Sequence, residues 1–251
     1  MKIPGDQLAP LIHIARLGKG EAKELAEVYR SRLAANPFDS ASVVLLADAL
    51  AASGQADQIE PEIVAWENRV PIESRFPLVA IVRSFALYEA GKPQESLDLC
   101  LNNPPIRDSA IAAQSMLALG RTKEVADDPS FEKLRDDPWF SLSVSLGFAL
   151  DGRADDAKTW RDRAVKSLGT HGAEWRKLGQ LLASEVPVPV TDFDRFYVSP
   201  EDKALLFAAM AERFPTKRAE YRAAAARFNL QRKPPYLLIQ RALASKPPAS
   251  K

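Results

Sequence analysis

The sequence predicts an all-α protein built from antiparallel helix pairs. Ala, Leu, Glu, Arg and Lys dominate the segments between turn residues, and apolar positions recur at steps of three and four. Proline and glycine, which end helices, return at nearly regular intervals. The chain has 251 residues, and 46% of them are hydrophobic. This is enough apolar material for a long helical array with a core.

The interval between the turn residues is close to 34. Successive prolines are separated by 34, 34 and 33 residues in the series Pro37, Pro71, Pro105 and Pro138. Successive glycines are separated by 34, 37, 29 and 32 residues in the series Gly20, Gly54, Gly91, Gly120 and Gly152. This is the length of one helix-turn-helix unit, so we expect about five helix pairs.

Residues 40–52 and the segment after them illustrate one such unit. Asp39 or Ser40 is a suitable N-cap for the first helix, and Gly54 ends it. The apolar face of the first helix consists of Val43, Leu46, Ala47 and Leu50. The inner face of the second helix consists of Ile59, Ile63 and Trp66. Pro71 closes the unit.

Other segments repeat this order of residues with variations. The unit before it has Leu25-x3-Tyr29 followed by Pro37. The series after Pro77 is Ser84, Leu87, Gly91, Ser96 and Cys100, and the series after Pro138 is Ser145, Phe148, Gly152 and Ala157. Between them, residues 107–137 are a shortened unit, because Asp128-Pro129 interrupts the second helix. The segment Trp175-x2-Leu178-Gly179-x2-Leu182 comes last.

These residues resemble the tetratricopeptide-repeat (TPR) family, whose pattern is W-x2-L-G-x2-Y, then A-x3-F, then P. The resemblance covers roughly residues 5 to 185. It implies a right-handed superhelix of antiparallel helix pairs, a TPR-like α-solenoid. It also implies that the first helix of each pair lines a concave face on which partner peptides or helices lie.

The array is predicted to end before residue 186. Val186-Pro187-Val188-Pro189-Val190 is extended or polyproline-like. After it, Ser199 is a good N-cap, and we expect helices at about 200–213, 216–229 and 235–244. The predicted organisation is therefore a repeat array at 1–185, a proline-rich connector at 186–199, a C-terminal helical cap at 200–245 and a disordered tail at 246–251. An open helical array needs such a cap over its last apolar face.

No recognisable catalytic or metal-binding pattern emerges from the titratable residues. The two histidines, His13 and His171, have no ligand partners at a recognisable spacing. Cys100 falls where the TPR pattern places a packed side chain, which favours a buried residue over a reactive thiolate. Each acidic pair precedes a proline or opens a helix, as capping residues do: Asp127-Asp128, Asp136-Asp137 and Asp155-Asp156. We therefore expect no enzymatic activity, no cofactor and no metal.

Partner binding is expected in an apolar groove on the first helices. The candidate groove residues are Leu78, Ile81, Phe85, Tyr88, Trp139, Leu142 and Leu146. Few basic side chains accompany them, which disfavours a clamp for a C-terminal carboxylate. Such a groove suits a helical or extended apolar segment, either of another protein or of this chain's own C-terminal helices.

A second hypothesis concerns the C-terminal helices, which are basic. The whole chain has 34 Lys and Arg against 33 Asp and Glu, but residues 191–251 contain twelve bases and six acids. The basic patch Lys217, Arg218 and Arg222 could bind an acidic partner or nucleic acid. Tyr221, Phe228, Ala224 and Ala225 recur at helical spacing, however, which indicates a buried face.

The first hypothesis is preferred: a scaffold or adaptor that binds another protein, with nucleic acid an unlikely partner. The N-terminal residues do not form a signal-peptide pattern, and the apolar runs are shorter than a membrane span. With a single cysteine, the sequence predicts a cytoplasmic protein.

Overall fold

The computed structural model describes residues 12, 13, 15–17, 19–71, 78–228 and 235–245. The chain forms two compact units, residues 1–107 and 108–251. Helices and turns account for the regular structure of the described residues, and these residues contain no strand. The predicted all-α class is therefore confirmed.

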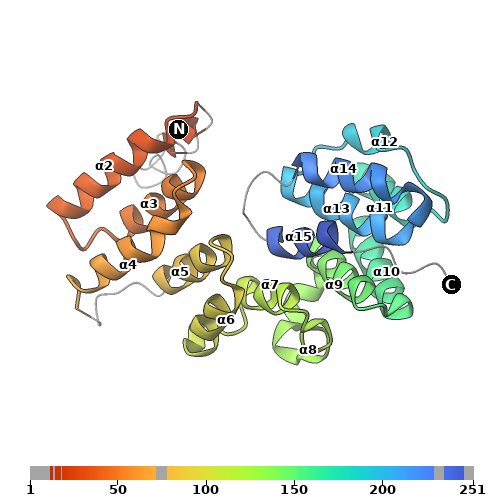
Figure 1. Cartoon of the computed structure of the whole chain (residues 1–251), viewed down its shortest axis with the longest axis horizontal. Helices are drawn as coiled ribbons and strands as arrows, with labels where there is room; N and C mark the ends of the chain where they lie inside the picture. Colours follow the sequence, from red (N-terminus) through yellow and green to blue (C-terminus); the bar gives the residue numbers. More distant parts are fainter. Residues whose placement is uncertain (1–11, 14, 18, 72–77, 229–234, 246–251) are drawn as a thin grey trace. The chain divides into compact units, whose positions relative to one another are not determined.

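Unit 1 consists of consecutive helix pairs, coloured red to yellow in Figure 1. Its helices are α2 (Ala22–Ala35), α3 (Ser40–Ala52), α4 (Ile59–Glu67), α5 (Leu78–Glu89) and α6 (Pro93–Leu101), with 3-10 turns at Ala56–Gln58 and Pro104–Ile106. The side chain of Asp39 accepts a hydrogen bond from the backbone N–H of Ser42, so it caps α3 as predicted. Leu46, Leu50, Ile63 and Trp66 are among the buried residues of its core.

Unit 2 contains the remaining helices. They are α7 (Ala110–Ala118), α8 (Thr122–Asp127), α9 (Pro138–Leu150), α10 (Ala154–Thr170), α11 (Ala173–Ala183), α12 (Thr191–Asp194), α13 (Pro200–Arg213), α14 (Arg218–Phe228) and α15 (Tyr236–Ala244), with 3-10 segments at Pro129–Asp136 and Pro215–Lys217. The interruption predicted at Asp128-Pro129 is present: α8 ends at Asp127 and a 3-10 segment follows.

The periodic glycines all make the same turn. Their φ angles lie between 74° and 81° at Gly20, Gly54, Gly91, Gly120 and Gly152. In each turn the N–H of the next residue donates to the carbonyl five residues earlier, at 2.8 to 3.1 Å. This bond is the mark of a Schellman helix end, where the left-handed backbone favours glycine. The predicted helix ends are therefore confirmed.

The paired helices approach each other at small residues. In the pair α5–α6, Ser96 Oγ donates to the carbonyl of Ser84 at 2.8 Å. In the pair α9–α10, Ser145 Oγ donates to the carbonyl of Ala157 at 2.7 Å. At Gly179 of α11, a Cβ atom would lie 3.3 Å from the carbonyl oxygen of Val165 in α10. Small side chains at these positions allow the close contact of helices that the sequence pattern predicts.

Helix α9 is the centre of unit 2. Every residue from 140 to 148 is buried, so this helix has no solvent-exposed face over more than two turns. It packs against α10, α13, α8, α15 and α7. A helix that is apolar on all sides must be covered on all sides. Unit 2 is thus a bundle around α9 and not simply the end of a linear stack.

The C-terminal helices lie close to their predicted positions and belong to unit 2. Helix α13 packs against α9, α14 and α15. The connector before α13 is bonded to α14, where Tyr221 Oη donates to the carbonyl of Val188 at 2.6 Å and accepts from its N–H at 2.9 Å. The boundary between the two units lies at 107/108, inside the array predicted for residues 1–185. Helices α9 to α11 of that array form one unit with α13, which packs on α9. The predicted tail lies outside the described residues.

No helix in the described ranges has both the length and the apolar character required to cross a membrane. The longest, α10, has 17 residues and carries several charged side chains.

The start of α13 provides a pH-dependent prediction. Ser199 accepts a hydrogen bond from the N–H of Asp202 at 3.1 Å, as expected for the N-cap. Burial raises the pKa of the Asp202 carboxyl to about 6, the hydrogen bond with Ser199 lowers it, and the charges of Glu201 and Asp137 raise it. The folded state therefore holds this proton more tightly than the unfolded chain, whose Asp pKa is about 3.9.

It follows that Asp202 favours folding at low pH and that this contribution is lost as the pH rises from about 4 through about 6. We expect Asp202→Asn to raise the free energy of unfolding above pH 6.5 by about 1 kcal/mol, a value reduced for partial exposure and for the helix dipole. Urea unfolding of both proteins at pH 4 and pH 7.5 measures the change. A difference between the two proteins that is the same at both pH values would contradict the prediction.

Candidate functional site

The predicted groove residues on α5 differ in accessibility. Ile81 and Phe85 are partly exposed, whereas Tyr88 is fully buried. Leu78 begins α5, but its side chain lies outside the described residues. Ile81 and Phe85 are thus the described groove candidates on α5 that a partner could reach, and a groove on α5 stays a prediction.

The predicted groove residues on α9 are mostly covered. Trp139 is partly exposed, but Leu142 and Leu146 are buried. The covering element near Leu146 is α13, whose Ala209 and Met210 line the same cavity as Leu146. In unit 2, helix α13, the first helix of the predicted C-terminal cap, thus occupies part of the face that was a candidate for a partner.

The basic patch is largely engaged within the protein. Arg218 is buried, and its guanidinium donates to the carbonyl of Ala211 and to Glu212, each at 3.3 Å. Arg222 donates to Glu212 at 2.9 Å and to Ser245 at 2.6 and 2.8 Å. Lys217 is more exposed and pairs with Glu220 at 2.8 Å. Two of the three side chains therefore bind the helices of unit 2 together, which leaves little charge for nucleic acid.

The residues considered for chemistry have structural partners. His13 is buried, with Nδ1 3.0 Å from Tyr29 Oη and Nε2 2.8 Å from Asp48 Oδ2. His171 is exposed, and its Nδ1 lies 2.8 Å from the carbonyl oxygen of Ser167. Cys100 is buried, as predicted, with its Sγ 3.4 Å from Ser84 Oγ.

Two of the three acidic pairs supply a capping residue, and the third lies in the first turn of a helix. Asp128 accepts a hydrogen bond from the N–H of Ser130 at 2.8 Å. Asp137 accepts from the N–H groups of Trp139 and Phe140 at 2.7 and 2.8 Å. Asp155 and Asp156 lie in the first turn of α10. Within the described part of the chain, no group of three His, Cys, Asp or Glu side chains could hold a metal ion.

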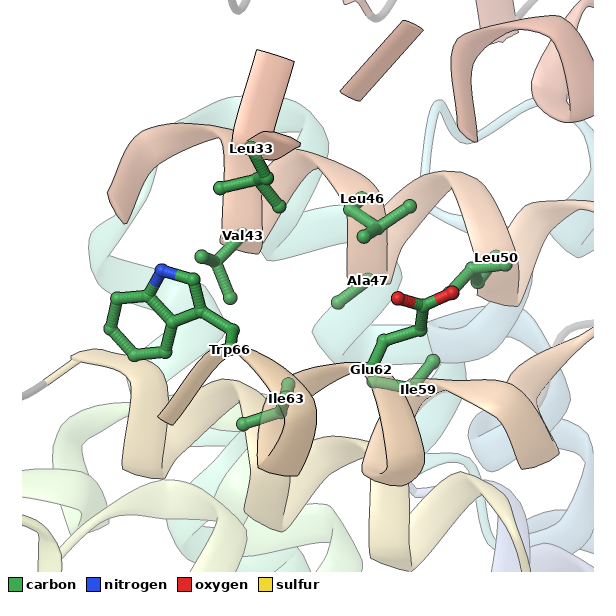
Figure 2. Close-up of a pocket in the computed structure, with 9 residues that line it drawn as sticks. All are labelled: Leu33, Val43, Leu46, Ala47, Leu50, Ile59, Glu62, Ile63 and Trp66. Carbon is green, nitrogen blue, oxygen red and sulfur yellow. The ribbon is translucent and has the colours of Figure 1, made fainter. Parts of the chain in front are cut away.

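A small cavity lies inside the core of unit 1. Figure 2 shows its lining, which comes from α2, α3 and α4 and is apolar except for Glu62. Its volume is about 10 Å³, which is the room that a single water molecule needs. The Glu62 carboxylate accepts a hydrogen bond from Arg30 Nε at 2.7 Å, and Trp66 Nε1 donates to the carbonyl of Pro37 at 2.6 Å. This cavity is therefore a feature of helix packing and not a ligand site.

The best candidate for a binding site in unit 2 is an aromatic surface formed by Trp139, Trp175 and Tyr197. The rings of Trp139 and Trp175 meet edge to face, with centroids 6.2 Å apart, and both are partly exposed. Tyr197 is fully exposed. Next to it is a depression of about 210 Å³ lined by Glu174, Trp175, Arg195, Phe196, Tyr197 and Val198.

The local sequence explains why these side chains are presented. Trp175 lies in the first turn of α11, just after Gly172, whose φ of 111° turns the chain. Phe196 is buried and anchors the segment between α12 and α13. Because the chain is anchored at Phe196, the next side chain, Tyr197, points into solvent. Arg195 lies over the Phe196 ring at 5.0 Å and places a positive charge at the edge of the depression.

Trp139 is one of the predicted groove residues and Trp175 belongs to the last repeat-like segment, whereas Tyr197 belongs to neither. The available signal was the run Arg195-Phe196-Tyr197 just before a helix cap, where only one of two adjacent aromatic residues can pack inward. No protein-family model matches the chain, and neither a curated protein nor a solved structure matches it. The resemblance to the TPR family therefore rests on the residues quoted above and stays a prediction.

Proposed function

We propose that this chain is a TPR-like helical-repeat protein that acts as a scaffold or adaptor and binds an extended apolar segment of another protein. The aromatic surface of unit 2 is the proposed contact. The observation that carries the proposal is the fully exposed Tyr197 beside the partly exposed Trp175 and a depression of about 210 Å³. A cytoplasmic location is part of the same proposal and is supported by the buried thiol of Cys100.

The chemistry of this surface favours an extended segment over a helix. Aromatic rings that flank a shallow depression accept the side chains of an extended, often proline-containing segment. Tyr, Trp and Arg are the residue types that contribute most to protein interfaces, and this surface combines all three. Arg195 would further favour a segment with an acidic residue beside the apolar one.

The geometry of the helix pairs supports the repeat assignment. Five glycine turns with one hydrogen-bond pattern recur along the chain. Small residues lie where the helices of a pair touch, as the TPR pattern requires.

The test is affinity capture from the native cell's lysate with the wild type, Tyr197→Ala and the matched control Phe38→Ala. Phe38 is also an exposed aromatic residue, but it belongs to unit 1. We expect a protein that is retained by the wild type and by Phe38→Ala and lost with Tyr197→Ala. Titration of the responsible segment should show binding weakened about 30-fold by Tyr197→Ala, corresponding to about 2 kcal/mol.

A fourth protein, Phe85→Glu, tests the alternative site on α5, where Phe85 is partly exposed. Partners that are kept by Tyr197→Ala but lost with Phe85→Glu would place the site on α5. Identical partners for all variants, or none, would refute binding at the aromatic surface. Circular dichroism of each variant verifies that it is folded.

A further inference from the structure

Unit 2 also contains a cavity whose lining is apolar and charged, unlike the aromatic lining of the depression beside Tyr197. Its volume is about 270 Å³, and it lies between α9, α10, α11 and α13. Its apolar wall includes Leu146, Ala149, Ala157, Leu182 and Met210. Its charged lining residues are Arg161, Glu212 and Arg213. This volume is just below the usual range for ligand sites of about 300 to 1,000 Å³, so a small ligand would fill it.

Arg161 occupies a position that is apolar and buried in three other helix pairs. It lies nine residues after the turn glycine Gly152, and the residues nine after Gly20, Gly54 and Gly91 are Tyr29, Ile63 and Cys100. All three of those side chains are buried in the core. A charged side chain in a core position is costly unless something compensates its charge. Arg161 therefore needs a group that compensates its positive charge.

The protein supplies Arg161 with little compensation. Its side chain is 15% exposed, and its nearest acidic atom is Asp162 Oδ1, 3.8 Å from Nη2. Its Nε is buried and has no hydrogen-bond partner within the described residues. Burial lowers the pKa of the Arg161 guanidinium and the charge of Arg213 lowers it further, while Asp162 and Glu185 act in the opposite direction.

Arg213 brings a second guanidinium to the same cavity. It is held in place by the end of α11, since it donates to the carbonyls of Leu182 at 2.6 Å and Ala183 at 3.3 Å. Its acidic partner, Glu185, is 3.2 Å away but is 83% exposed. Two arginines that are 52 residues apart in sequence thus line the same cavity.

The remaining charge at the cavity does not neutralise this pair. Glu212 also lines the cavity, but its carboxylate accepts from both Arg218 and Arg222. The charged side chains in and around the cavity are four arginines and three carboxylates. The arginines are Arg161, Arg213, Arg218 and Arg222, and the carboxylates are Glu212, Glu185 and Asp162. Glu185 and Asp162 are solvent-exposed and weakly coupled to the cavity. The charged lining residues, Arg161, Arg213 and Glu212, therefore have a net positive charge, and the rest of the lining is mainly apolar.

We propose that this cavity binds a small organic carboxylate with an apolar body. The carboxylate would accept hydrogen bonds from Arg161 and Arg213, in the geometry for which guanidinium groups are suited. The apolar body would pack against Leu146, Leu182 and Met210. This site is independent of the aromatic surface, and its occupant is a small molecule and not a protein segment.

The test uses sodium octanoate as the probe, with 1-octanol and inorganic phosphate as comparisons, and calorimetric titration of the full chain in a buffer free of organic acids. We expect octanoate to bind and the two comparison molecules to bind at least about tenfold more weakly, because each lacks one half of the complementary chemistry. Arg161→Met retains the aliphatic stem and should weaken octanoate binding about tenfold or more. The matched control Lys166→Met, on the exposed side of the same helix, should bind as the wild type does.

A second variant keeps the test valid if Arg161→Met does not fold. Ala149→Phe fills the cavity without changing any charge and should abolish octanoate binding. Octanoate binding as tight as that of the wild type in folded Arg161→Met, or any octanoate binding retained by folded Ala149→Phe, would overturn the proposal. Octanol binding as tight as octanoate, phosphate binding as tight as octanoate, or absence of octanoate binding by the wild type would also overturn it.

Discussion

Replacing Glu212 by alanine is expected to lower the free energy of unfolding of unit 2 by about 3 to 5 kcal/mol, the cost of breaking a buried ion pair by removing one partner. The Glu212 side chain is 10% exposed and joins Arg218, also 10% exposed, to Arg222, 19% exposed. Without the carboxylate, two guanidinium groups remain in a poorly hydrated place. Urea unfolding followed by circular dichroism measures the loss.

Two variants separate this explanation from a loss of packing. Glu212→Gln keeps the shape and one acceptor oxygen but removes the charge, so it should retain part of the stability that the alanine variant loses. Glu220→Ala removes a carboxylate from the more exposed pair with Lys217 and should change the stability little. An alanine variant at position 212 as stable as the wild type would contradict the role assigned to this network.

Replacing Gly147 by alanine is expected to destabilise unit 2 by about 2 to 3 kcal/mol, although alanine is the better helix former by about 1 kcal/mol. A Cβ at this position would lie 2.7 Å from Thr122 Oγ1 and 2.8 Å from Thr122 Cγ2. Thr122 is fully buried in the first turn of α8, so it cannot move out into solvent without disturbing the packing. Thermal and urea unfolding of the variant report the loss.

The double variant Thr122→Ala, Gly147→Ala provides the decisive control. Removing the two obstructing atoms of Thr122 should recover most of the stability lost in the single variant, so the two substitutions should be strongly non-additive. Gly179→Ala serves as a milder comparison, because its new Cβ would meet atoms at 3.3 Å or farther. Additive effects at positions 122 and 147 would show that the close contact is not the cause.

The local features of the fold could be predicted from the sequence because short-range rules determine them. The turn glycines, the caps Asp39 and Ser199, and the burial of Tyr221, Ala224 and Ala225 agree with the predictions. Each depends on residues within a few positions of one another. The positions of α13 to α15 were predicted for the same reason.

The arrangement of helices that are distant in sequence could not be predicted in this way. The pattern of α9 indicates only that it is apolar on all sides, and it does not identify α13 as one of its covers. The same limit applies to the functional candidates. Arg161 and Arg213 meet only because α10 and α13 both pack on α9. Arg222 was predicted to lie on a basic surface, but it is bonded to Glu212 and Ser245, which are 10 and 23 residues away in sequence.

The packing of α13 on α9 also has a consequence for the order in which unit 2 folds. The pair α9–α10 closes across a three-residue turn, whereas α13 can reach α9 only after residues 151–199 have been brought back. Closing the longer segment has the greater entropic cost, so we expect the helix pairs to form first and α13 to dock late. Until then the apolar flank of α9 around Leu146 is uncovered. Newly made chains would be most prone to self-association during this interval.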